Sequence, residues 1–144
     1  MNKQTTQRGF TLIELMLVVG LISVLVAIAL PSYLSFVQKG KRSDGMAALM
    51  NTAQLQEQFL LDRNTYSATL AGLGMTNPTP EGHYNITIAA ATANCPINRC
   101  YSLTATPIGT QADDDRCASF TLTSNGTKTA LDSDGNPSND CWSR

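Results

Sequence analysis

Residues 9–19 read GFTLIELMLVV, and the chain then stays almost wholly apolar through Leu30. A short basic leader precedes this stretch, and it ends at Gly9 before the apolar residues begin. An ordinary secretory signal places its small-residue cleavage site after the apolar stretch, so this junction is of another kind. Cleavage after Gly9 would leave the apolar helix on the mature chain, with a free ammonium on Phe10. Glu14 would then lie four residues from that ammonium, a spacing that puts both groups on one helix face.

The apolar window from Phe10 to Leu30 predicts a membrane-spanning helix. Its 21 residues would extend about 31 Å, which is enough to cross a hydrocarbon core. Charged residues are missing between Glu14 and Lys39. Basic residues occur on both sides of this window, so the positive-inside rule leaves its orientation open.

The cysteines give that orientation. All four lie beyond the apolar window, at Cys95, Cys100, Cys117 and Cys141. An even number in a small domain predicts two disulfides in an oxidising compartment, and three pairings are possible. Their spacing is unlike a zinc site or a redox CxxC motif. The part of the chain after the helix, which we call the head, is therefore expected in the periplasm or outside the cell.

Charge argues against nucleic acid as a partner of the head. From Ser43 onward the chain carries five Lys or Arg against ten Asp or Glu, a net charge of −5. Binding to phosphate backbones depends on cationic contacts, so an acidic head is a poor non-specific DNA ligand.

The helix is expected to continue past the membrane, as one element over residues 10–61. These 52 residues would run about 78 Å, far longer than a compact head, so the first half must protrude and needs a bilayer or partner helices. Apolar residues at helical spacing should face the head, and the glutamines and glutamate of 54–58 should fall mostly on the other side. The predicted inward residues are Met46, Leu49, Met50, Ala53 and Leu60, with Leu55 and Phe59 widening the face.

Two residues of the protruding half disfavour regular helix. Gly20 costs about 1 kcal/mol relative to Ala, and Pro31 removes one backbone hydrogen bond. The sequence predicts a helix break here, either a simple kink in the isolated chain or a loss of helicity when subunits pack.

Four short strands should follow a turn-rich linker that ends near Gly82. Alternating residues share one face in each of the first three, and Ser124-Asn125-Gly126 signals a hairpin into residues 127–131. A sheet with one apolar face needs a cover, which the second half of the helix supplies. The predicted fold class is therefore α+β, a long helix on a four-stranded antiparallel sheet.

No catalytic set is apparent, and we expect no enzymatic activity and no cofactor. The one histidine, His83, stands in a predicted loop. The run Asp113-Asp114-Asp115 is interpreted as a solvated loop. Asp132, Asp134 and Asp140 form a weak calcium candidate, because alternating oxygen ligands precede Gly135 without the remaining spacing of a calcium loop. A turn built from turn-forming residues is favoured over a metal site.

The sequence around Gly9 resembles the class III signal of type IV prepilins and type II secretion pseudopilins, residue for residue. The segments EQFLLDRNTY (57–66) and YSLTATP (101–107), with the ending that includes Cys141-Trp142, are similar to PilE-type minor pilins. The resemblance implies a leader at 1–9, a protruding helix at 10–42 that is membrane anchor and filament core, and a head at 43–144. It also implies cleavage between Gly9 and Phe10, N-methylation of Phe10, and a role for Glu14 in assembly.

The same resemblance implies that Cys117 and Cys141 bound a C-terminal disulfide loop, and we expect Cys95 to pair locally with Cys100. It implies as partners other pilin subunits through the N-terminal helices, the prepilin peptidase, the inner-membrane assembly platform, and the membrane before assembly. The location would be the bacterial inner membrane first and an extracellular pilus afterwards. A minor pilin is favoured, with a major pilin or a type II secretion pseudopilin as alternatives.

Overall fold

The computed structural model describes residues 9–89 and 91–143, so the predicted leader, apart from Gly9, lies outside the described residues. The main helix, α1, spans Leu12–Arg63 and has 52 residues. Thr11 caps its start, since the Glu14 amide donates to the Thr11 hydroxyl at 3.3 Å. The helix therefore begins two residues later than predicted. Phe10 lies just outside it, and a shared helix face for its ammonium and Glu14 in the processed chain stays a prediction.

The chain divides into two compact units after Val37. In the first unit, the described residues form the apolar part of α1. An 18-residue window of α1 has a mean hydropathy of 2.8 with none of it buried, so the helix is long and apolar enough to cross a membrane. The helix is continuous through Gly20 and Pro31 in the single chain. The kink, and the loss of helicity expected when subunits pack, stay predictions.

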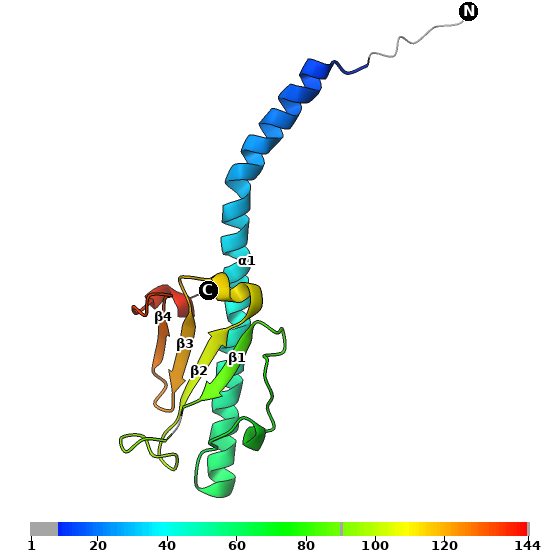
Figure 1. Ribbon diagram of the computed structural model, residues 1–144. Helices are drawn as coiled ribbons and strands as arrows, with labels where there is room; N and C mark the ends of the chain where they lie inside the picture. The colour runs from blue at the N-terminus through cyan, green and yellow to red at the C-terminus, as the bar shows by residue number, and fades with distance from the viewer. Residues whose placement is uncertain (1–8, 90, 144) are drawn as a thin grey trace, which may run out of the picture. The chain divides into compact units, whose positions relative to one another are not determined.

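The second unit, which contains the head, holds a four-stranded antiparallel sheet in the order β1-β2-β3-β4 (Figure 1). The strands are β1 (Tyr84–Ile88), β2 (Ser102–Pro107), β3 (Ser119–Thr123) and β4 (Lys128–Leu131). Three short 3-10 helices lie between or after them, η1 (Ala71–Leu73), η2 (Gly109–Asp113) and η3 (Asn139–Trp142). Ser124-Asn125-Gly126 forms the predicted turn between β3 and β4. The α+β prediction is confirmed.

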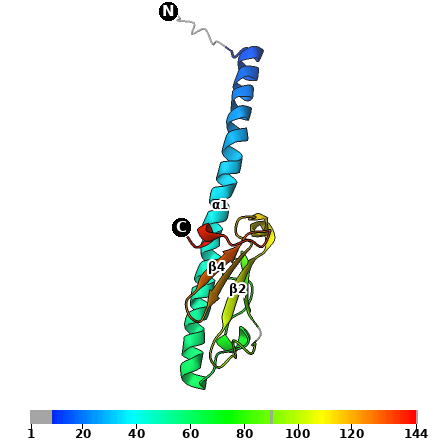
Figure 2. The ribbon, with the colours of Figure 1, turned by 90° about the vertical axis from the view of Figure 1, so that its left-hand side faces the viewer.

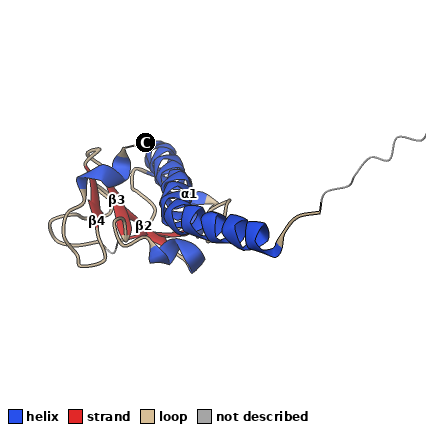
Figure 3. Ribbon diagram, turned by 90° about the horizontal axis from the view of Figure 1, so that it is seen from above, coloured by secondary structure: helices blue, strands red, loops and turns tan. Residues whose placement is uncertain are grey.

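One face of the sheet is covered by the head portion of α1, from Gln38 to Arg63. Figure 2 shows the two layers side by side, and Figure 3 shows the strands in a row beside the helix. Cross-strand pairs such as Ile86↔Ala105 and Phe120↔Ala130 bring buried residues together. Period-two alternation along each strand is therefore the physical origin of the core.

The inward face of the helix agrees with the prediction only in part. Its fully buried residues are mostly small or polar: Arg42, Asp44, Gly45, Ala48, Leu49, Thr52 and Gln56. Of the predicted set, Leu49 is buried, and Met46, Ala53 and Leu60 are partly buried and pack against the core, whereas Met50 is 47% exposed. Small residues occupy much of this face because the sheet packs closely against the helix. A Cβ on Gly45 would lie 3.0 Å from ring atoms of Tyr84, so glycine permits the approach.

Gln56, predicted to face outward, is fully buried at the far end of this interface. Its side-chain amide donates to the Ser67 carbonyl and accepts from the Ser67 amide, both at 2.8 Å. The helix ends at Arg63, two residues beyond the predicted end, where Asn64 adopts a positive φ of 54° and its amide donates to the Leu60 carbonyl. The chain therefore turns back sharply, and Gln56 holds the returning segment.

Both edge strands have neighbours on their outer sides. On β1, the Asn77 side chain bonds the amide and the carbonyl of Ile86 at 2.8 and 2.9 Å. The Tyr84 amide donates to the Thr79 hydroxyl at 3.0 Å, and the Thr79 backbone amide donates to the Tyr84 carbonyl at 2.8 Å. On β4, the Trp142 indole donates to the Thr129 carbonyl at 2.8 Å. The backbone groups of Tyr84 and Ile86 on β1, and the Thr129 carbonyl on β4, therefore have partners within the chain.

Candidate functional site

The residues predicted to act in processing and assembly lie together at the start of the described chain. Gly9 and Phe10 precede the helix and are exposed, and so is Glu14 in its first turn. A carboxylate in this position is favoured by the free amides of the helix N-terminus. Thr11-x-x-Glu14 also has the pattern of a capping box, a signal that the sequence interpretation did not use. Exposure leaves the junction and the carboxylate accessible to other molecules.

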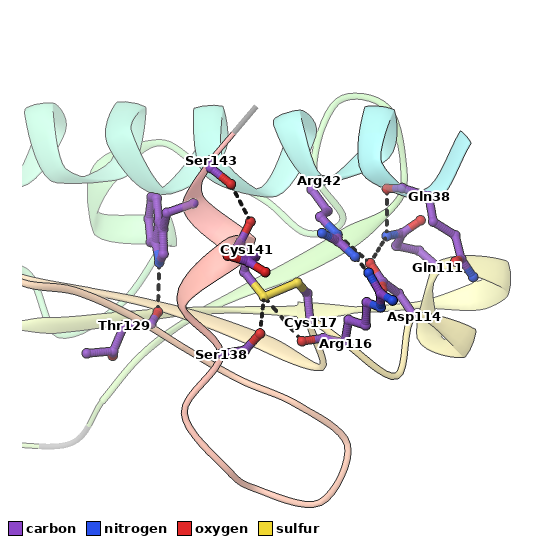
Figure 4. Close-up of a disulfide and its surroundings, with 12 residues drawn as sticks. Gln38, Arg42, Gln111, Asp114, Arg116, Cys117, Thr129, Ser138, Cys141 and Ser143 are labelled. Carbon is purple, nitrogen blue, oxygen red and sulfur yellow. Dashed lines mark hydrogen bonds and ion pairs between the residues drawn. A yellow bond between two sulfur atoms is a disulfide. The ribbon is translucent and has the colours of Figure 1, made fainter. Parts of the chain in front are cut away.

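A buried ion pair connects α1 to the segment after η2. Arg42 donates from Nε and Nη2 to the two carboxylate oxygens of Asp114, each at 2.7 Å. Figure 4 shows the two side chains facing each other. They are only 6% and 2% exposed. The interpretation of residues 113–115 as a solvated loop is therefore wrong for Asp114, although Asp113 and Asp115 are exposed. Nothing in the local sequence distinguishes Asp114 from its neighbours, so only the tertiary contact reveals its role.

Gln111 extends this pair into a network. Its side-chain nitrogen lies within hydrogen-bond distance of Asp114 at 3.1 Å, the Tyr84 hydroxyl at 3.1 Å and the Gln38 carbonyl at 3.2 Å. Burial raises the pKa of Tyr84 to about 12; the hydrogen bond from Gln111 opposes that rise, while the nearby Asp114 charge adds to it. The network joins the helix, η2 and β1, and so fixes the orientation of the sheet against this part of the helix.

A second polar group lies further along α1. The Glu57 carboxylate accepts from the Tyr66 and Tyr101 hydroxyls, each at 3.3 Å. The two rings pack edge to face with centroids 4.8 Å apart. Burial, with the charge of Glu57, raises the pKa of Tyr101 to about 12.

The C-terminal tail is held by a disulfide between Cys117 and Cys141, with Cα atoms 5.7 Å apart (Figure 4). Both cysteines are fully buried, and the next residue, Trp142, packs edge to face on Phe120. Cys95 and Cys100 form the second disulfide, in the loop between β1 and β2. The tail is thus fixed by one covalent and one aromatic contact.

The weak calcium candidates form no metal-binding group within residues 9–89 and 91–143. In these ranges no three His, Cys, Asp or Glu side chains converge in a way that could hold an ion. Asp132 instead accepts the amides of Asp134 and Asn136 at 3.0 and 2.8 Å, which makes a turn. His83 is half-buried, with its ring nitrogen 3.9 Å from Glu81, and its amide donates to Asp44.

Comparison with known proteins gives the family. A family profile described as "Type IV minor pilin ComP, DNA uptake sequence receptor" matches residues 31–121, more than half of the 144 residues. A second profile, "Prokaryotic N-terminal methylation motif", matches residues 4–30. The chain belongs to the type IV pilin family. The predicted family is confirmed, and its members are structural subunits and not enzymes.

Relatives include both major and minor pilins. The chain is 32% identical to the type IV major pilin protein PilA of Myxococcus xanthus over 102 residues, 71% of this chain but only 46% of that one. It is 31% identical to the type IV wide pilus major component PilA4 of Thermus thermophilus over 93 residues, which cover 62% and 71% of the two chains.

Among solved structures, the non-core minor pilin PilV of Neisseria meningitidis aligns with a TM-score of 0.54 and 21% identity. The alignment covers 71% of this chain and 94% of that one, and it supports the fold alone.

Proposed function

We propose that this chain is a minor pilin that helps to initiate or assemble a type IV pilus and is incorporated in the fibre. The observation that carries the proposal is the match of residues 31–121 to the minor-pilin profile, because this span holds the head portion of α1, the first two strands and the start of the third. The exposed apolar residues of the first unit support the assembly part, since apolar surface on this scale requires lipid or partner helices.

The subunit would pass through two environments. Residues 1–9 would be removed by the prepilin peptidase, and residues 10–42 would anchor the chain in the inner membrane with the head, 43–144, in the periplasm. The inner-membrane platform would then insert the helix among the helices of other pilins, in an extracellular pilus. The hydropathy of α1 and the two disulfides of the head support this order.

Processing is tested at the junction of Gly9 and Phe10. Gly9→Leu should leave an unprocessed, membrane-bound precursor, because a bulky side chain would stand beside the scissile bond. Mass spectrometry of the wild-type chain should find Phe10 as an N-methylated N-terminus. Mature mass of the Gly9→Leu variant in pili would show that the cleavage site lies elsewhere.

Glu14 would serve assembly in its charged form, by pairing with the amine of a neighbouring or incoming subunit. A carboxylate in hydrocarbon needs such a partner, and Glu14 is exposed in the single chain. Glu14→Val should therefore keep or strengthen membrane insertion and reduce incorporation into filaments. The matched control is Glu14→Gln, which keeps the size and removes the charge. Normal incorporation of both variants would contradict the charged role.

A major pilin and a type II secretion pseudopilin are the alternatives to a minor pilin. Quantitative mass spectrometry of sheared surface filaments separates them. A minor pilin should appear in the filaments at a small fraction of the main subunit, and its deletion should lower filament number. A chain that makes up the bulk of the fibre would be a major pilin, and one that is missing from surface filaments would favour the pseudopilin.

A DNA receptor is a second candidate function, because the matching profile is described as a DNA uptake sequence receptor. The net charge of −5 beyond Ser43 disfavours it. Gel-shift titration of the purified protein with duplex DNA at physiological salt should detect no binding. A sequence-dependent shift would establish the receptor function.

A further inference from the structure

The turn between β3 and β4 carries a chemically labile pair, Asn125-Gly126. Asn125 is the one asparagine of the chain that a glycine follows. The backbone nitrogen after an asparagine can attack the side-chain amide carbon, and glycine has no Cβ that would hinder this nitrogen. Both residues are exposed, and a Cβ built on Gly126 would have no described atom within 4 Å beyond its chain neighbours. Water and hydroxide therefore have access to this peptide bond.

The structure holds the Asn125 side chain by its oxygen. Oδ1 accepts the Thr127 amide at 3.1 Å and also accepts the Thr123 hydroxyl. When a nucleophile adds to Cγ, negative charge develops on Oδ1. Two donors already directed at this oxygen stabilise that charge, as the donors of an oxyanion hole do. The turn therefore favours attack on Cγ.

One hydrogen bond of the turn has to open first. The Gly126 amide donates to the Thr123 carbonyl at 2.8 Å, and Gly126 has a positive φ of 81°. The nitrogen can reach Cγ only after this bond opens. Exposed turns open at a much lower free energy than the whole domain, so the step does not require the head to unfold.

We propose that Asn125 is a site of spontaneous deamidation in the folded head. Hydroxide removes the Gly126 amide proton, and the nitrogen forms a bond to Cγ of Asn125. The bond from Cγ to Nδ2 breaks, and Nδ2 takes a proton from water and leaves as ammonia. The product is a cyclic succinimide. Water then opens the ring at Cγ to give aspartate, or at the main-chain carbonyl carbon to give isoaspartate. In sum, asparagine and one water yield one acid and one ammonia, without oxidation.

The two products differ in the turn. Aspartate keeps the side-chain oxygens that accept from Thr123 and Thr127, and its charge strengthens both bonds. Isoaspartate routes the main chain through Cβ and Cγ, which lengthens the turn by one methylene and removes the side-chain acceptor. Either product makes the net charge beyond Ser43, which is −5 in the unmodified chain, one unit more negative. This chemistry goes beyond the proposed function, because it needs neither membrane nor filament.

The test is incubation of the folded full-length chain in mild detergent and heavy-oxygen water, at physiological pH and temperature, followed by peptide mapping. Asn125 should acquire a labelled carboxylate before any other asparagine. Thr123→Val keeps the side-chain shape and removes one donor to Oδ1, so the reaction should slow about threefold or more. Thr121→Val is the matched control, on the same face of β3, and should react as wild type does. Amide exchange at Gly126, measured in all three proteins, separates turn opening from the chemical step.

Three results would overturn the proposal. The first is earlier conversion of another asparagine. The second is an unlabelled Asn125 in the folded chain under conditions in which the urea-unfolded chain converts. The third is an unchanged or faster reaction in Thr123→Val with wild-type exchange at Gly126, which would remove the role of the Oδ1 donors. The readout uses no pilus, so its failure would leave the proposed minor-pilin function intact.

Discussion

Replacing Gln56 by methionine should destabilise the head strongly, although the sequence pattern predicted that this side chain faces solvent. The change keeps the volume of the side chain and removes both hydrogen bonds to the backbone of Ser67. Ser67 is only 5% exposed, so water cannot readily replace these bonds. Each buried backbone group left without a partner costs about 1–3 kcal/mol. We therefore expect a loss of about 2–4 kcal/mol, which lowers the melting temperature of a domain of this size by about 10–20 °C.

Thermal unfolding of the full-length chain in mild detergent, followed by the fluorescence of Trp142, measures this loss in the head itself. The matched control is Gln54→Met, on the same helix but exposed, which should change stability by no more than about 0.5 kcal/mol. If Gln56→Met and Gln54→Met melt within about 2 °C of each other, the two hydrogen bonds do not stabilise the head as we argue.

Three further predictions concern the rest of the head. Asp114→Ala leaves the Arg42 guanidinium buried without its counter-charge, so the free energy of unfolding measured in urea should fall by about 3–5 kcal/mol. A fall of less than about 1 kcal/mol would mean that the pair is not buried in solution. Cys141→Ser opens a loop with a sequence separation of 24 and should cost about 3.5 kcal/mol, with faster amide exchange in the tail but unchanged membrane insertion. The pKa of Tyr84 and of Tyr101 is about 12 in the folded head and about 10 in the unfolded chain. Their contribution to the free energy of unfolding should therefore be fully present below pH 10 and should be lost as the pH rises toward 12. Absorbance titration at alkaline pH should find these two tyrosines ionising late, and ionisation at the ordinary pH without unfolding would contradict their burial.

The strands and the helix could be predicted from the sequence because their patterns are local. Period-two alternation gave residues such as Ile86 and Phe120 an inward direction, and they are buried in the structure. The inward face of α1 could be predicted only in part: Leu49, Met46, Ala53 and Leu60 do contact the core. Hydrophobicity favoured Met50, but the closeness of the sheet selects small residues such as Gly45, whose advantage depends on the ring of Tyr84.

The polar contacts of the head could not be predicted from the sequence for a related reason. Arg42 and Asp114 are 72 residues apart, and each stands in a run of charged residues that suits a solvated surface. Gln56 likewise sits among polar neighbours. A buried polar residue is identified by its partner, and a partner distant in the chain leaves no mark on the local pattern. Glu14 is different, because the assembly role that we propose for it concerns molecules that a single chain does not contain.

The satisfied edges of the sheet restrict how crowded subunits can meet. An open edge strand would template the addition of another chain's backbone, which leads to irreversible aggregation. Asn77 and Thr79 occupy that template on β1, and Ser138 and Trp142 bond β4. These bonds leave less of each edge strand open to the backbone of a neighbouring head, so contacts through side chains are favoured. The linker before β1 and the tethered tail thus oppose amyloid-like growth of the head.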